Sequence, residues 1–277
     1  MRRLAGLLAL TLLVGGCGSS GSGDGRPSVV ASFYPLAYLV ERIGGADVRL
    51  TDLTPPGAEP HDLELSPRQA GDLEDADLVV YLRGFQPAID DAVPKGAFDV
   101  TDVVPLNGGD PHIWLEPALL YALVNPLRAR IASIDEGHRD AYVQRGRQLY
   151  AELERLDREF VAGLKSCKRH DVVFGHDAFG YLTMRHGLRQ IAIGGRDPEA
   201  EPSPARVGEV IRLARAAKVT TVFVERLDAP GAARTVADEI GARLAVLDPV
   251  ERVTGDDDYF TVMRRNLAAL RLALDCA

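Results

Sequence analysis

Eight short apolar runs of strand length alternate with helical patterns along the chain. They form two sets, at residues 28–33, 48–53, 77–82 and 98–103 in the first half and at residues 171–174, 189–193, 219–224 and 243–247 in the second. Strands that alternate with helices build parallel sheets from βαβ units. The sequence therefore predicts an α/β fold with one parallel sheet in each half of the chain.

A single long helix is predicted between the two sets, over residues 136–166. Its apolar residues recur at steps of four and three, which places them on one face: Leu149, Leu153, Leu156, Phe160 and Leu164. At 1.5 Å per residue this helix would be roughly 45 Å long, enough to run along a body of two lobes. We therefore expect an N-terminal lobe at 28–135 and a C-terminal lobe at 167–277, joined by one rigid helix.

The two lobes share a pattern that starts a helix. Ser66 precedes Pro67 and Ser203 precedes Pro204, and each pair leads toward a predicted strand. Serine caps a helix N-terminus, and proline is tolerated at the first helical position. The same pattern in both halves agrees with two similar lobes.

The first residues of the chain predict secretion. Two arginines precede an apolar run at 4–14, and two glycines then lead to Cys17. That order is typical of a secretory signal peptide, here at 1–16. The cysteine after small residues resembles the bacterial lipobox, in which the signal is cut before Cys17 and that cysteine receives lipid; an ordinary signal with an incidental cysteine is the alternative. The Gly/Ser-rich linker at 17–27 would then be a flexible tether.

The charge of the chain limits its partners. The formal net charge is -8, and removal of the signal peptide with its two arginines would make the mature chain more acidic. An acidic surface argues against nucleic acid and against a polybasic membrane patch. No other apolar run approaches the ~20 residues of a membrane-spanning helix. We expect an extracytoplasmic monomer, attached to the cell membrane through its N-terminal lipid.

Two further cysteines remain if Cys17 carries lipid. Cys167 and Cys276 would then be an even pair in an oxidising compartment. Such pairs usually form a disulfide. Two separate buried thiols are the alternative. A bond would join the tail of the chain to the end of the predicted interlobe helix.

Three histidines and one aspartate follow the carboxyl ends of predicted strands. They are His61 after the second strand, His112 after the fourth, His176 after the fifth and Asp248 after the eighth. In open α/β sheets, ligands bind at that edge. Three imidazoles and one carboxylate suit tetrahedral zinc. The sequence therefore predicts a zinc site between the two lobes.

Other polar residues have less specific patterns. His138 and His170 are predicted at the surface, and His186 at the end of a helix, where a cation suits the helix dipole. Glu225 ends the seventh strand, where it would either orient a ligand histidine through its second ring nitrogen or form a salt bridge with a neighbouring arginine. Trp114 is predicted to pack in the core beneath the His112 loop.

The stretches around the three histidines resemble motifs of a known family, the zinc and manganese solute-binding proteins of bacterial ABC importers. They are Glu-Pro-His-Asp at 59–62, Asp-Pro-His-Ile-Trp-Leu-Glu-Pro at 110–117 and Gly-His-Asp-Ala-Phe-Gly-Tyr at 175–181. The resemblance extends over about residues 29–274. It implies two lobes on one rigid helix and delivery of the metal to the membrane permease of an ABC importer. It also implies four metal ligands: His61, His112, His176 and Asp248.

Two stretches depart from the family pattern. Arg-Gly-Phe-Gln at 83–86 stands where relatives tend to have Asn-Gly followed by Glu and Trp. Leu-Asn-Gly-Gly at 106–109 is short and lacks the histidines that many zinc members carry before the second motif. Metal capture is therefore expected to depend on the main site alone.

Three alternatives compete with a zinc carrier. A manganese carrier of the same family is the first, although zinc outcompetes manganese at nitrogen sites. A lipid-anchored metallohydrolase is the second, but catalytic zinc usually keeps three protein ligands and an open position, and no His-Glu-x-x-His segment occurs. A surface adhesin with a structural metal is the third. We expect a carrier of Zn²⁺ and not an enzyme.

Overall fold

The computed structural model describes residues 25–198, 200–225 and 231–277. The predicted signal peptide, Cys17 and most of the predicted linker lie outside these residues. Among the helices that are described, none combines the length and the apolar character needed to cross a membrane.

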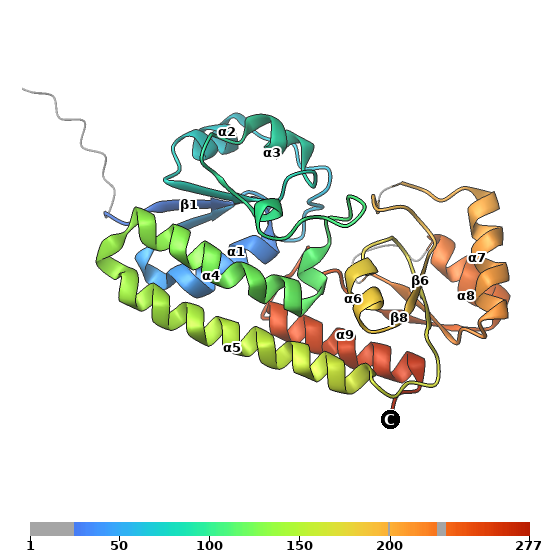
Figure 1. Ribbon diagram of the computed structural model, residues 1–277. Helices are drawn as coiled ribbons and strands as arrows, with labels where there is room; N and C mark the ends of the chain where they lie inside the picture. Colours follow the sequence, from blue (N-terminus) through green and yellow to red (C-terminus); the bar gives the residue numbers. More distant parts are fainter. Residues whose placement is uncertain (1–24, 199, 226–230) are drawn as a thin grey trace, which may run out of the picture.

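Two four-stranded parallel sheets form the centres of two lobes (Figure 1). The first has the order β2-β1-β3-β4, with β1 at Ser28–Ala31, β2 at Arg49–Asp52, β3 at Leu78–Tyr81 and β4 at Phe98–Asp99. The second has the order β6-β5-β7-β8, with β5 at Asp171–Phe174, β6 at Arg189–Ala192, β7 at Thr221–Val224 and β8 at Arg243–Val246. The two orders are equivalent, and all pairs are parallel. The predicted α/β fold with two parallel-sheet lobes is confirmed.

Helices cover both sheets. In the N-terminal lobe they are α1 (Tyr34–Gly44), α2 (Pro67–Glu74), α3 (Pro87–Ala92) and α4 (Pro117–Ile134). In the C-terminal lobe they are α6 (Gly180–Arg185), α7 (Pro204–Ala216), α8 (Gly231–Ile240) and α9 (Tyr259–Leu274). Short 3-10 turns complete the fold: η1 (Gly45–Asp47), η2 (Val100–Asp102), η3 (Ile113–Leu115) and η4 (Glu136–His138).

The two serine–proline helix starts behave as the sequence predicts. The Ser66 hydroxyl accepts a hydrogen bond from the backbone N–H of Gln69, and the Gln69 side chain accepts one from the Ser66 backbone N–H, which together make a capping box. The Ser203 side chain accepts from the backbone N–H of Arg206 at the start of α7.

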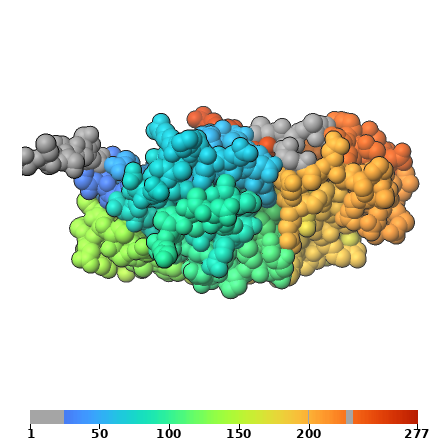
Figure 2. All heavy atoms as spheres, turned by 90° about the horizontal axis from the view of Figure 1, so that it is seen from above, coloured from blue at the N-terminus to red at the C-terminus, as the bar shows by residue number. Residues whose placement is uncertain are grey.

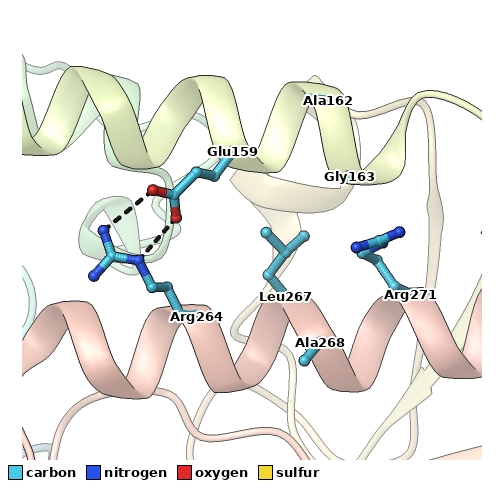
Figure 3. A pocket seen from close by; sticks show the side chains of 7 residues that line it. All are labelled: Glu159, Ala162, Gly163, Arg264, Leu267, Ala268 and Arg271. Atoms are coloured by element: carbon cyan, nitrogen blue, oxygen red, sulfur yellow. Dashed lines mark hydrogen bonds and ion pairs between the residues drawn. The ribbon is translucent and has the colours of Figure 1, made fainter.

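The predicted interlobe helix is α5, at Arg139–Leu164, with η4 directly before it. All five apolar residues of the predicted stripe are buried. Figure 1 shows α5 running beneath both lobes, with α4 beside its first half and α9 beside its second, and α5 contacts both helices. Figure 3 shows the contact with α9 at close range, where Glu159 of α5 faces Arg264 of α9. The helix therefore joins the lobes as one rigid rod.

The fourth strand is shorter than predicted, because the side chain of Asp99 ends it. Asp99 Oδ1 accepts a hydrogen bond from the Thr101 backbone N–H at 2.8 Å, and this contact turns the chain into η2.

Cys167 and Cys276 are joined by a disulfide, as predicted. Seen from above, the atoms of the two lobes meet directly along one boundary (Figure 2).

Candidate metal centre

Four side chains from the facing ends of the two sheets come together between the lobes. His61 follows β2 and His112 follows η2 in the N-terminal lobe, whereas His176 follows β5 and Glu251 follows β8 in the C-terminal lobe. One ligand atom from each of these residues lies within 4.8 Å of the others. The structure thus brings together the three histidines that the sequence predicts as ligands.

The ligand atoms of this group are buried and lack hydrogen-bond partners. They are Nε2 of each of the three histidines and both carboxylate oxygens of Glu251. His112 is 0% exposed and Glu251 is 2% exposed. Buried polar atoms in folded proteins almost always have a partner, so these unpartnered atoms need an explanation. A metal ion bound by one atom from each of the four residues would provide one, and the donor set fits a metal.

Carboxylates hold the remaining ring nitrogen of two histidines. His112 Nδ1 lies 2.7 Å from Asp110 Oδ1, and His176 Nδ1 contacts Glu225 Oε1. Because an ionised carboxylate only accepts, Nδ1 carries a proton in each ring, and Nε2 is the nitrogen left for a metal ion. This arrangement fixes both the tautomer and the ring orientation that a metal ion requires.

His61 is held differently. Its backbone N–H donates to Glu59 Oε1 at 3.1 Å, and its ring packs edge-on against Phe85 with 4.6 Å between centroids. Its side chain is 11% exposed, which is more than the side chain of His112 or His176. His61 is therefore the most exposed of the three histidines.

Residues of the C-terminal lobe fix the loop that carries His112. Trp114 Nε1 donates to the Pro249 carbonyl at 2.7 Å, and the Tyr259 hydroxyl donates to the Trp114 carbonyl at 2.7 Å. The Tyr181 hydroxyl donates to the Asp110 carbonyl at 2.8 Å. Trp114 also packs against Phe33 and Phe85 in the core, as predicted. His112 is thus held rigidly from both lobes.

Asp248, predicted as the carboxylate ligand, does not belong to the group of four. Its Oδ1 accepts from the Val250 backbone N–H at 2.8 Å, and its own backbone N–H and carbonyl pair with the Asn266 side chain on α9. Val250 has a φ of 62°, so the chain turns sharply there. This turn directs Glu251 toward the histidines, whereas Asp248 is not part of their group.

Glu251 is not predicted by the sequence, because the rule that ligands bind at the carboxyl ends of parallel strands identifies a loop and not one residue within it. The one available signal is that Glu251 is acidic and lies in the same loop as Asp248, three positions further along the chain. Either could point inward, and the backbone turn at Val250 decides which one does.

Glu225 makes both of the contacts that the sequence offered as alternatives. Its Oε1 contacts His176 Nδ1, and its Oε2 accepts from Arg252 Nη2 at 2.9 Å. The orienting contact and the salt bridge therefore coexist on one carboxylate.

Burial controls the protonation of the group. It lowers the pKa of His112 to about 4, although Asp110 opposes this shift, and it lowers the pKa of His61. Burial also opposes the charged form of His176, but the hydrogen bond and negative charge of Glu225 outweigh it and raise that pKa. Burial raises the pKa of Glu251 well above its usual value. Two of the three imidazoles are thus neutral at neutral pH, which is the form that binds a metal.

The other three histidines lie apart from this group. His138 and His170 are exposed, as predicted. His186 lies at the C-terminal end of α6, as predicted, but it does not act as a cation there, because its side chain is only 5% exposed and burial lowers its pKa to about 4.

The fold and the site together define the class: a two-lobed α/β protein on one rigid helix, with a buried site for a metal ion between its lobes. Over residues 29–273 the chain matches the family model ZnuA, described as zinc-uptake complex component A, periplasmic, and it belongs to that family.

Known relatives have similar sequences. The chain is 29% identical to the zinc-binding lipoprotein AdcA of Streptococcus pneumoniae over 98% of its own length and 60% of that protein. It therefore spans about three-fifths of that relative. It is also 29% identical to the high-affinity zinc uptake system protein ZnuA of Bacillus subtilis, over 97% of its own length and 96% of that protein.

Solved structures show the same fold. The laminin-binding protein Lmb of Streptococcus agalactiae, described as bifunctional with adhesin and metal-transporting activity, matches with a TM-score of 0.82 and 31% identity, over 90% of this chain and 99% of that one. The Zn(II)-bound ZnuA-like domain of Streptococcus pneumoniae AdcA matches with a TM-score of 0.78 and 28% identity, over 91% of this chain and 100% of that one.

Proposed function

We propose that this chain is an extracytoplasmic solute-binding protein that captures Zn²⁺ between its lobes and delivers it to the permease of an ABC importer. One observation carries the proposal: unpartnered nitrogen and oxygen atoms of His61, His112, His176 and Glu251 converge in a buried space between two lobes. Membership of the zinc-uptake family and the Zn(II)-bound structure of a relative support zinc as the cargo.

The donor set favours a carrier over an enzyme. Three imidazole nitrogens and one carboxylate oxygen complete a tetrahedral zinc shell, which leaves no position for the water that a catalytic zinc activates. Three imidazoles also favour zinc over manganese, which prefers oxygen ligands. We infer that the chain binds and releases zinc without catalysing a reaction.

Metal titration tests this function. We expect one Zn²⁺ per chain and a higher melting temperature, because a cargo at 100 times its dissociation constant stabilises the folded state by ~2.7 kcal/mol. The measurement is metal analysis of purified protein together with thermal melting with and without zinc. Two or more tight sites per chain, or tighter binding of Mn²⁺ than of Zn²⁺, would contradict the proposal. A chelator should remove the metal and leave the protein folded, whereas a structural metal of an adhesin would leave only with unfolding.

The fourth ligand can be tested by two matched variants. Glu251→Ala removes the carboxylate that is grouped with the three imidazoles, so we expect zinc affinity to fall about 10-fold or more, the scale at which even outer ligand partners act. Asp248→Asn keeps an oxygen that can accept from Val250, so its effect should be much smaller. Competition with a chromophoric chelator gives both affinities. A larger loss in Asp248→Asn than in Glu251→Ala would restore Asp248 as the ligand.

We further propose that Cys17 carries lipid and that residues 18–27 tether the folded body to the outer face of the cell membrane. The support is the sequence order of charge, apolar run, small residues and cysteine, together with the AdcA relative, which is described as a lipoprotein. Cys17→Ala should move the protein from the membrane fraction to the soluble extracytoplasmic fraction. Retention of the variant in the membrane fraction would exclude this anchor.

A further inference from the structure

Arg252 lies between two carboxylates that belong to different lobes. Its Nη2 donates to Glu225 Oε2 at 2.9 Å, and its Nη1 lies 3.7 Å from Glu59 Oε2. Glu225 directly follows β7 in the C-terminal lobe, and Glu59 lies in the loop after β2 in the N-terminal lobe. All three side chains are largely buried, with 12% exposure for Arg252, 7% for Glu225 and 14% for Glu59. The ion pair between Arg252 and Glu59 therefore crosses the boundary between the lobes, whereas the pair with Glu225 lies within the C-terminal lobe.

Each of these carboxylates also holds one of the histidines. Glu225 contacts Nδ1 of His176, and Glu59 accepts the backbone N–H of His61 at 3.1 Å. Arg252 is, in addition, the residue that follows Glu251 in the chain. A single guanidinium thus touches the supports of two histidines and is covalently next to the carboxylate of the group.

Arginine suits this position better than another cation would. Its planar guanidinium presents several N–H donors in a fixed fork and can bind two carboxylates at once. Loss of one partner from a buried ion pair leaves the other charge uncompensated. At interfaces between proteins, such losses mainly raise the rate of dissociation.

We propose that Arg252 is an interlobe positioning residue, which ties the supports of His61 and His176 to each other and thereby slows the escape of Zn²⁺. This inference rests on the proposed function. It concerns the rate at which zinc leaves the site. Each lobe supplies only two of the four ligands, so this rate also depends on how firmly the two lobes are held together.

The charge of Arg252 and its geometry predict opposite effects. A guanidinium near the site repels Zn²⁺, so on charge grounds alone its removal would slow zinc release. If Arg252 instead positions the ligand supports, its removal should speed zinc release. The sign of the change in rate therefore separates the two roles.

The experiment measures the rate of zinc loss from the zinc-loaded full chain to an excess of chelator. We expect Arg252→Gln to release zinc at least 5-fold faster than the unchanged protein. Arg252→Lys, which keeps the charge but not the fork, should fall between the two. Glu59→Gln should also speed release, and the double variant should be no faster than Arg252→Gln alone, because both changes break the same connection.

A matched control comes from the contact between the interlobe helix α5 and α9. Arg264 of α9 donates two hydrogen bonds to the carboxylate of Glu159 on α5, from Nε at 2.8 Å and from Nη2 at 3.2 Å (Figure 3). Arg264→Gln removes a guanidinium from an ion pair outside the metal group, so its zinc release should be unchanged. A general loss of stability would instead affect both variants, and melting of the metal-free proteins measures it.

Several results would overturn the inference. They are a release rate for Arg252→Gln within 2-fold of the unchanged protein, a slower release, or effects of Arg252→Gln and Glu59→Gln that multiply in the double variant. Should Arg252→Gln not fold, an unchanged release rate in Glu59→Gln would overturn it equally. Failure of the unchanged protein to bind zinc would instead refute the proposed function, so the two failures are distinguishable.

Discussion

Replacement of His112 by alanine is expected to lower the affinity for zinc by more than about 100-fold. Mutation of outer partners that only orient a ligand already costs 10–100-fold, so loss of a ligand itself should cost more. His112 is fully buried, and its ring is held by Asp110 while its loop is held by both lobes. Water could enter the gap, but it would lack the basicity of imidazole and its fixed orientation. Zinc titration against a competing chelator measures the change.

His138→Ala is the matched control for this prediction. His138 is half exposed, and its Nδ1 lies 2.7 Å from Asp135 at the start of the interlobe helix, outside the metal group. Its removal deletes one imidazole without touching the site, so zinc affinity should stay within a few-fold of the unchanged protein. Equal losses in the two variants would place the metal elsewhere. Melting of metal-free His112→Ala would show whether the cavity left by the ring disturbs the fold itself.

The sequence is sufficient to predict the architecture because the architecture depends on repeated local patterns. Short apolar runs between helical segments define parallel strands, and one uninterrupted stripe defines α5, whose five predicted apolar residues are all buried. Helix starts at Ser66 and Ser203 depend on chemistry within three residues. Each of these signals is local, and the fold repeats them in two lobes.

The three histidines were predictable for a related reason. Carboxyl ends of parallel strands lie at one edge of a sheet, so residues far apart in the sequence meet there. The resemblance of residues 110–117 to a family motif added specificity at His112. The structure brings these three imidazoles together, whereas their binding of zinc remains a prediction.

The choice of carboxylate depended on a backbone angle and was not predictable from pattern. Asp248 and Glu251 are both acidic and lie in the same loop, and only the turn at Val250, with φ of 62°, directs Glu251 inward. A positive φ is uncommon for a residue with a branched side chain, so no sequence rule indicates it there. The contacts of Arg252 were equally hidden, because they join segments from three loops.

Removal of the disulfide is expected to have the second large effect, which concerns the stability of the fold and not the binding of zinc. Cys167 and Cys276 are 109 residues apart, and the chain-entropy model gives about 4.7 kcal/mol of stabilisation for a closed loop of that length. We expect Cys167→Ser/Cys276→Ser to lower the free energy of unfolding by up to that amount in denaturant titrations of the metal-free protein.

The same double variant should bind zinc almost as tightly as the unchanged protein. Cys167 lies before the start of β5, whereas His176 lies beyond its other end, so the bond and the site are at opposite edges of the sheet. Backbone pairs next to the bond, including Ala277 N–H to the Ser166 carbonyl at 2.9 Å, would still hold the tail of the chain. The control is the unchanged protein under reducing conditions, which should lose stability to the same extent. Two free thiols in the non-reduced, denatured protein would show that the bond does not form, and a loss of zinc affinity as large as that of His112→Ala would show that the tail of the chain supports the metal centre across the lobe.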